Sequence, residues 1–175
     1  MITKNLRALL SAFTSNNSYS KAVMVKSEDG TVCLGGGYTG DSMTLGTAWV
    51  NTSASGSYAY NSLRVGKGTT EPTAEDYCLE AENTSLTLVS ASATGGYNNN
   101  NISEGNTAKT IVATYVNSTE EAVTISEVGY FIQHANSYLR GSTASTTRNF
   151  LMAREVIDPV EIGAGETYTF TFVIE

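Results

Sequence analysis

The sequence predicts an all-β protein, a β-sandwich of jelly-roll or immunoglobulin-like type with a short N-terminal α-helix. Short apolar runs with a two-residue period recur along the chain, and clusters of Gly, Asn and Ser separate them. The period is clearest near the end, where Tyr168, Phe170, Phe172 and Ile174 alternate with Thr and Val, as in a strand with one face on a core. Because strands do not alternate with long helices, a parallel α/β sheet is not expected.

The composition is that of one domain with a hydrophobic core. Hydrophobic residues make up 41% of the 175 residues and charged residues only 15%, against about 25% charged residues in typical domains. A chain of this length usually forms a single core. We therefore predict a helical arm over residues 1–18 and a β-sandwich over residues 19–175, with Val65, Ile125, Leu151 and Phe170 lining the inside of its two layers. Cys33 and Cys78 have strand-like neighbours and are expected to be small buried thiols.

Residues 2–13 predict a short amphipathic helix. Its apolar stripe consists of Ile2, Leu6, Leu9, Leu10 and Phe13. A helix of this length is marginal on its own, so the stripe must dock, either on its own domain or on a neighbouring subunit. In the second case Leu6, Leu9, Leu10 and Phe13 bind a partner chain, and the domain should fold without residues 1–14.

The rest of the chain predicts a hairpin and six further strands. The hairpin joins residues 21–26 and 31–34 through an Asp29-Gly30 turn. The further strands are expected over residues 62–66, 84–92, 109–116, 122–133, 150–156 and 167–174. Near Ser126 and Glu127 the apolar alternation changes phase, which predicts a β-bulge. Asp158-Pro159 follows the fifth of these segments, and a Gly-rich turn precedes the last.

A long Gly-, Ser- and Thr-rich stretch over residues 35–58 is the first candidate for a contact surface. Polar segments of this length in a small domain are usually functional or mobile loops. The stretch contains Tyr38 and the single tryptophan, Trp49, and Tyr138 lies in another polar segment. Tyrosine offers a large rigid contact area at small entropic cost. We therefore predict Tyr38, Trp49 and Tyr138 as partner-binding residues, with protein and sugar as alternative partners.

Charge and hydropathy argue against nucleic-acid and membrane partners. The net charge is −7, and the ten basic residues are scattered singly, whereas phosphate backbones are bound by clustered Lys and Arg. No apolar run approaches the roughly 20 residues that span a bilayer. The N-terminus lacks the apolar stretch of a secretion signal, so we expect a soluble protein that is made without one.

The residues give no constellation for catalysis. Gly40-Asp41-Ser42 resembles an esterase nucleophile block, but Phe131 stands where an aspartate would orient His134. With one His and two distant Cys, no zinc site can be assembled, and no other metal or cofactor is expected. An acidic run consists of Glu71, Glu75, Asp76, Glu80 and Glu82. We interpret this run as a solvated face, in preference to a calcium site or a paired-carboxylate glycosidase site. The chain is not expected to be an enzyme.

Two segments of the chain resemble small structural proteins of tailed bacteriophages. The first is LRVGKGTTEPTAEDYCLE, over 63–80; the second begins as TISEVGYF, over 124–131, and resumes as LMAREVIDPVEIGAGETYTFTFVIE, over 151–175. Together with the opening MITKNLRALLSAF, they are similar to a recurring pattern of turns and strands in that group.

The resemblance implies a non-enzymatic virion component that docks on the capsid or tail. Such a component would be a head decoration, head-fibre or tail-associated protein. It would be made in the host bacterial cytoplasm, bind other virion proteins and form homo-oligomers. The alternative function is a carbohydrate- or receptor-binding module of a tail tip or fibre, with Trp49 and loop tyrosines stacking on a host surface glycan.

Overall fold

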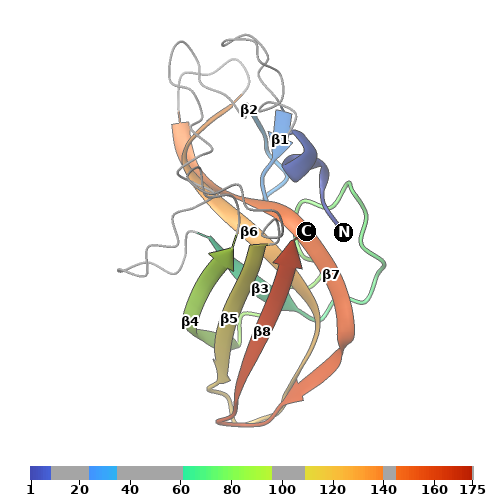
Figure 1. Ribbon diagram of the computed structural model, residues 1–175, viewed down its shortest axis with the longest axis vertical. Helices are drawn as coiled ribbons and strands as arrows, with labels where there is room; N and C mark the ends of the chain where they lie inside the picture. The colour runs from blue at the N-terminus through green and yellow to red at the C-terminus, as the bar shows by residue number, and fades with distance from the viewer. Residues whose placement is uncertain (9–23, 35–60, 96–108, 140–144, 175) are drawn as a thin grey trace.

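A computed structural model describes residues 1–8, 24–34, 61–95, 109–139 and 145–174 (Figure 1). Within these residues the chain forms eight strands and one short helix, over residues 4–8. The strands are β1 (Met24–Lys26), β2 (Val32–Leu34), β3 (Asn61–Gly66), β4 (Leu86–Gly95), β5 (Lys109–Asn117), β6 (Val123–Leu139), β7 (Ser145–Ile162) and β8 (Thr167–Ile174). The predicted all-β class, with a short helix at the start, is confirmed.

The strands form two antiparallel sheets that pack face to face. One sheet has the order β1-β2-β6-β3, with β7 paired to the other side of β6, and the second has the order β4-β5-β8. In Figure 1 the long β6–β7 ribbon runs the length of the molecule. Its upper part carries the β1–β2 hairpin and its lower part faces the second sheet. The arrangement is a β-sandwich with one sheet extended beyond the other.

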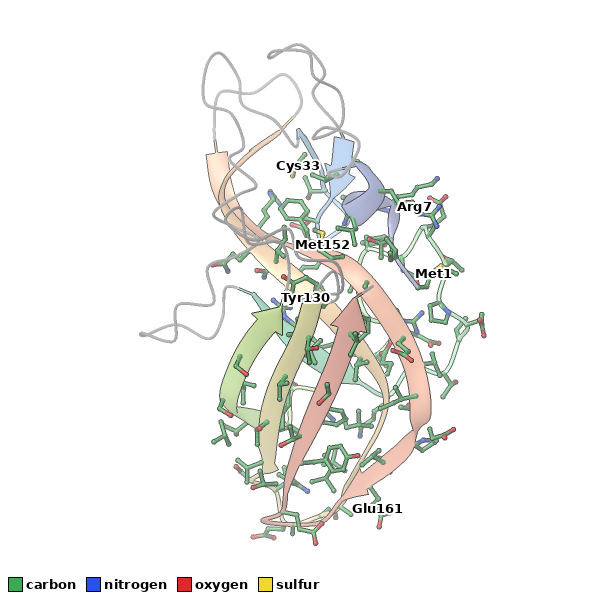
Figure 2. All side chains as sticks on the ribbon, viewed as in Figure 1. Met1, Arg7, Cys33, Tyr130, Met152 and Glu161 are labelled. Atoms are coloured by element: carbon green, nitrogen blue, oxygen red, sulfur yellow. The ribbon has the colours of Figure 1, made fainter. Side chains whose placement is uncertain are left out.

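The core lies between the sheets and continues up to the hairpin. It includes Val65 of β3, Tyr115 of β5, Tyr130 of β6 and Phe170 of β8, each at most 7% exposed. Figure 2 shows Tyr130, Met152 and Cys33 along the long axis of the molecule, and all three are buried members of this core. The alternation predicted for the last strand is confirmed for its two phenylalanines, since the core also contains Phe172.

The predicted bulge in β6 is confirmed. The pairing of β6 with β7 shifts register between Ile125 and Glu127. Because of this shift, Ile125 before the bulge and Val128 after it both enter the core, although they are three positions apart and would lie on opposite faces of a regular strand. Glu127 therefore points to the opposite face of the sheet, together with Gly129 and Phe131.

Both long strands run further than the sequence predicted. Strand β6 continues past Gln133 to Leu139 because β7 pairs with it on one side and β2 on the other. Strand β7 continues through Pro159, where the pattern indicated an end. Pro159 lies inside the register irregularity opposite Ser126, and an irregular edge position is where a strand tolerates a residue without an N–H donor.

The first residues belong to the same packed body as the sandwich. Ile2 forms an antiparallel bridge with Ala153, and the Thr3 N–H donates to the Met152 carbonyl at 3.0 Å. Leu6 is 1% exposed and packs in the main core. Of the two alternatives for the helix, Leu6 fits docking on its own domain. We therefore expect truncation of residues 1–14 to destabilise the domain, because it would remove Leu6 from the core.

The two cysteines differ in environment. Cys33 of β2 is fully buried, whereas Cys78 is partly exposed, and both are free thiols. Residues 77–79 form no strand, although their residue types are strand-like, and the partial exposure of Cys78 contradicts the predicted burial of its thiol. They belong to a connection that crosses the outer face of the first sheet, where neighbouring side chains and not a sheet ladder supply their contacts.

Candidate functional site

Residues 67–82, here called the covering segment, lie on the outer face of the β6–β7 ribbon. Leu79 of this segment packs with Phe131 and Leu151 in a second, separate hydrophobic cluster. The sequence indicated that Leu151 lines the inside of the sandwich, but the register shift between Tyr130 and Phe131 turns it outward. Gly129 makes the close approach possible, since a Cβ there would lie 2.7 Å from a Leu79 methyl group.

An arginine on β7 holds the covering segment by its charge. Arg154 donates from Nε to Glu127 Oε2 at 2.8 Å, from Nη1 to Asp76 Oδ2 at 2.9 Å and from Nη2 to Glu80 Oε2 at 3.3 Å. We call these four residues the Arg154 cluster. The Arg154 side chain is 4% exposed and that of Glu127 is completely buried. A buried guanidinium is stable only where charge and hydrogen bonds compensate its lost hydration, as they do here.

Glu127 joins the strand to the covering segment through the main chain. Its Oε1 accepts hydrogen bonds from the N–H groups of Gly68 and Ala81, at 3.1 and 2.8 Å. Its Oε2 accepts one from the Glu80 N–H at 3.2 Å in addition to the bond from Arg154. The buried carboxyl group therefore has four donors, which is close to the full capacity of a carboxylate.

The other two carboxyl groups of the cluster are held inside the covering segment. Asp76 Oδ1 accepts from the Thr73 hydroxyl at 2.7 Å, and Glu80 Oε2 accepts from the Thr70 N–H at 2.8 Å. Burial alone would raise the pKa of Asp76, but the hydrogen bonds from Thr73 and Arg154 lower it below the ordinary value. Hydrogen bonds from Thr70, foremost its N–H, lower the pKa of Glu80. Both groups are charged at neutral pH.

A second ion cluster lies beside the first on the same face. Arg64 of β3 donates to Glu28 of the hairpin turn at 2.5 Å and to Glu82 at 3.4 Å. Its guanidinium carbon lies 4.4 Å from the centre of the Phe131 ring. Glu28 also accepts from the Asn149 side chain at 2.6 Å. The hairpin turn and the covering segment are thus both tied to the sheet by cations that the sheet supplies.

These contacts correct the interpretation of the acidic run. Glu71 and Glu75 are exposed as expected, but Asp76, Glu80 and Glu82 each pair with a sheet arginine. A general acid needs a raised pKa, whereas the pKa values of Asp76 and Glu80 are lowered. Burial raises the pKa of the neighbouring Cys78 thiol, which opposes formation of a nucleophilic thiolate. In the part of the chain that the structure describes, no group of three or more His, Cys, Asp or Glu could hold a metal ion. The Arg154 cluster is suited to fastening a loop.

The partner-binding residues predicted from the sequence are only partly visible. Leu6 is buried, and Tyr138 lies on β6, where its main chain pairs with Leu34 and Ser145. Leu9, Leu10, Phe13, Tyr38 and Trp49 lie outside the described residues. The structure therefore brings none of them together into a site, and their roles stay predictions.

Sequence reasoning missed Glu127 and Arg154 as a pair. The signal was present, since each is a charged residue inside an otherwise apolar strand, in ISEVGYF and in LMAREV. A charge in such a strand is rarely buried without a partner of opposite sign. The pairing itself was not readable, because 27 positions separate the two residues.

Comparisons of the chain with protein-family models, with curated proteins and with solved structures give no match. Within the described residues, no helix is both long and apolar enough to cross a bilayer.

Proposed function

We propose that this chain is a non-enzymatic structural protein of a tailed-phage virion, an accessory component that docks on the capsid or tail. The proposal starts from the resemblance of residues 63–80, 124–131 and 151–175 to such proteins. One structural observation supports it most: the residues that carry the resemblance meet in one network, the Arg154 cluster.

The first resembling segment supplies the covering segment and the second supplies the strands beneath it. Gly68, Asp76 and Glu80 come from the first, and Glu127 and Arg154 come from the second. The glycine is required sterically, because a Cβ on Gly68 would lie 2.6 Å from Glu80 Cβ and 2.7 Å from Glu127 Cδ. The two resembling segments therefore contact each other in the fold, and the resemblance covers one connected structural unit and not two unrelated stretches.

The scaffold also fits the proposed role physically. A small acidic β-sandwich whose β1–β2 turn and covering segment are fastened to its sheet presents a rigid surface there to its neighbours. Rigid, preorganised surfaces lose little entropy on docking, which favours multi-copy binding to a lattice. In this proposal the protein is made in the host bacterial cytoplasm, incorporated into the particle and bound to other virion proteins.

The decisive experiment is to locate the chain in particles of a phage that encodes it. Mass spectrometry of purified virions should detect it at fixed stoichiometry, and a reconstruction should place its sandwich on the head or tail. Its absence from purified particles, with the protein present in the infected cell, would overturn the proposal.

The docking role of the helix needs a substitution and not a truncation. Replacing Leu9, Leu10 and Phe13 with Ser leaves Leu6 and the bridge between Ile2 and Ala153 in place, whereas deleting residues 1–14 removes them. Loss of incorporation by a folded variant would assign docking to these side chains. Normal incorporation, with glycan binding that Trp49→Ala abolishes, would instead favour the receptor-binding alternative.

A further inference from the structure

The outer edge of β8 differs from the other sheet edges that the structure describes. In Figure 1, β8 ends the second sheet, with β5 on its inner side. All eight residues of β8 pair with β5 in an unbroken register. Among the described residues, no hydrogen bond reaches its other side. Every second residue of this strand therefore presents an unpaired N–H and C=O.

The described edges of the first sheet each carry some protection. At β7, residues 1–3 pair with residues 152–154, and the rest of that edge carries three acidic residues and Pro159. At β1, the Asn5 side chain both donates to and accepts from the Lys26 main chain, at 2.7 Å each. At β3, the end of the edge is covered by the bridge between Gly66 and Glu82 and by the bond from the Asn83 N–H to the Val65 carbonyl at 2.8 Å.

The two edges of the second sheet differ from each other. Strand β4 contains a register shift between Leu88 and Ser90, a device that keeps edges from pairing. Strand β8 has no such shift, and its sequence, TYTFTFVI, contains no charge, Gly or Pro. On it, Tyr168 is 39% exposed and Val173 is 50% exposed. A regular, uncharged, apolar edge is a template for another strand.

We propose that this edge is the contact between two copies of the chain. Antiparallel pairing of β8 with its twofold-related copy satisfies the outward main-chain groups of both strands. It joins two three-stranded sheets into one of six strands. The charge of the protein favours this site over a charged edge: two copies with net charge −7 repel, and at β8 neither copy brings a charged side chain of the strand to the contact.

The geometry also fixes which residues meet. A twofold axis normal to the sheet keeps both cores on the same side, so odd residues lie opposite odd residues. Thr169, Thr171 and Val173 then face their counterparts on the exposed side, and Phe170 and Phe172 do so on the core side. This inference is independent of the virion proposal, since it requires only the isolated chain.

The test is sedimentation equilibrium of the full chain over a concentration series, with a matched pair of variants. Val173→Lys places a charge on the β8 edge, and Val89→Lys places the same charge at an equally exposed position, 51%, on the β4 edge. We expect a dimer for the wild type and for Val89→Lys. Val173→Lys should dimerise about tenfold more weakly or worse, because the pairing sets like charges close together.

Hydrogen exchange supplies a second measurement. Amide protection over residues 167–174 should rise with protein concentration in the wild type and not in Val173→Lys. If Val173→Lys fails to fold, as judged by circular dichroism, Thr171→Lys replaces it at another exposed position. A wild type that stays monomeric up to about 1 mM, or a dimer that survives the β8 charge or is lost with Val89→Lys, overturns the proposal.

Discussion

Replacing Arg154 with Met should lower the free energy of unfolding by about 3–5 kcal/mol, the usual cost of breaking a buried ion pair from one side. The substitution removes three charge-assisted donors and leaves Glu127 buried with the three N–H donors of the covering segment. Domains of this size are stable by only about 5–15 kcal/mol. The loss therefore shows clearly as a lower midpoint in urea unfolding followed by far-UV circular dichroism.

The structure also predicts that an apolar replacement of both partners will not restore stability. Many buried ion pairs can be exchanged for apolar residues without loss, but Glu127 additionally accepts from the N–H groups of Gly68, Glu80 and Ala81. Each N–H group left without an acceptor costs about 1–3 kcal/mol. Arg154→Met combined with Glu127→Leu should thus remain at least about 3 kcal/mol below the wild type.

Lys4→Met is the control, since Lys4 holds the same segment through an ion pair with Glu75 that is largely exposed. Its removal should change stability by no more than about 1 kcal/mol. If Arg154→Met unfolds within about 1 kcal/mol of the wild type, or the double variant recovers full stability, the cluster does not fasten the segment as described.

Three further changes test the same face and the core. The folded state lowers the pKa of Asp76 and Glu80 from their ordinary values of 3.8 and 4.5. The stability that these two carboxylates contribute is therefore present above their ordinary pKa values and is lost as pH falls through their pKa values in the folded state. The urea midpoint should drop between pH 6 and pH 3, and it should drop less steeply in Asp76→Asn. Gly68→Ala should cost about 1–3 kcal/mol of stability by overpacking. Gly165→Ala should cost about 1 kcal/mol, because Gly165 has φ +74° but open space around it. Equal losses of stability in thermal unfolding of the two variants would contradict this. Tyr115→Phe removes a buried hydrogen bond of 2.7 Å to a β3 carbonyl and should cost about 1 kcal/mol, so an unchanged melting temperature would show that the bond contributes nothing.

Local patterns predicted most of the strands. The Asp29-Gly30 turn, the Gly163–Glu166 turn and the alternation in β8 are contained in a few neighbouring residues, and each is confirmed. Even the bulge near Ser126 was visible, because it shifts the apolar residues of a single strand. The extensions of β6 and β7 could not be predicted from local patterns, because they form by pairing with each other, and β6 pairs with β2 as well.

The site was less predictable for the same physical reason. The acidic run looked solvated because the arginines that bind it, Arg64 and Arg154, lie elsewhere in the sequence. Leu151 was assigned to the wrong side because a register shift in the pairing of β6 with β7, which leaves Met152 as an extra residue in β7, decides its face. Alternation within one strand shows which residues share a face of the sheet. It does not show that both faces are covered, here one by the second sheet and the other by the covering segment.

The place of the first residues affects how the chain can fold during synthesis. Thr3 binds the main chain of Met152, 149 positions later, so the opening residues and the edge of β6 that β7 covers stay unpaired until β7 has left the ribosome. Contacts this distant slow folding, and an open edge on a nascent chain can pair with the wrong strand in the meantime. Yield in recombinant expression should therefore depend on temperature and on chaperones that shield these unpaired segments until β7 is made.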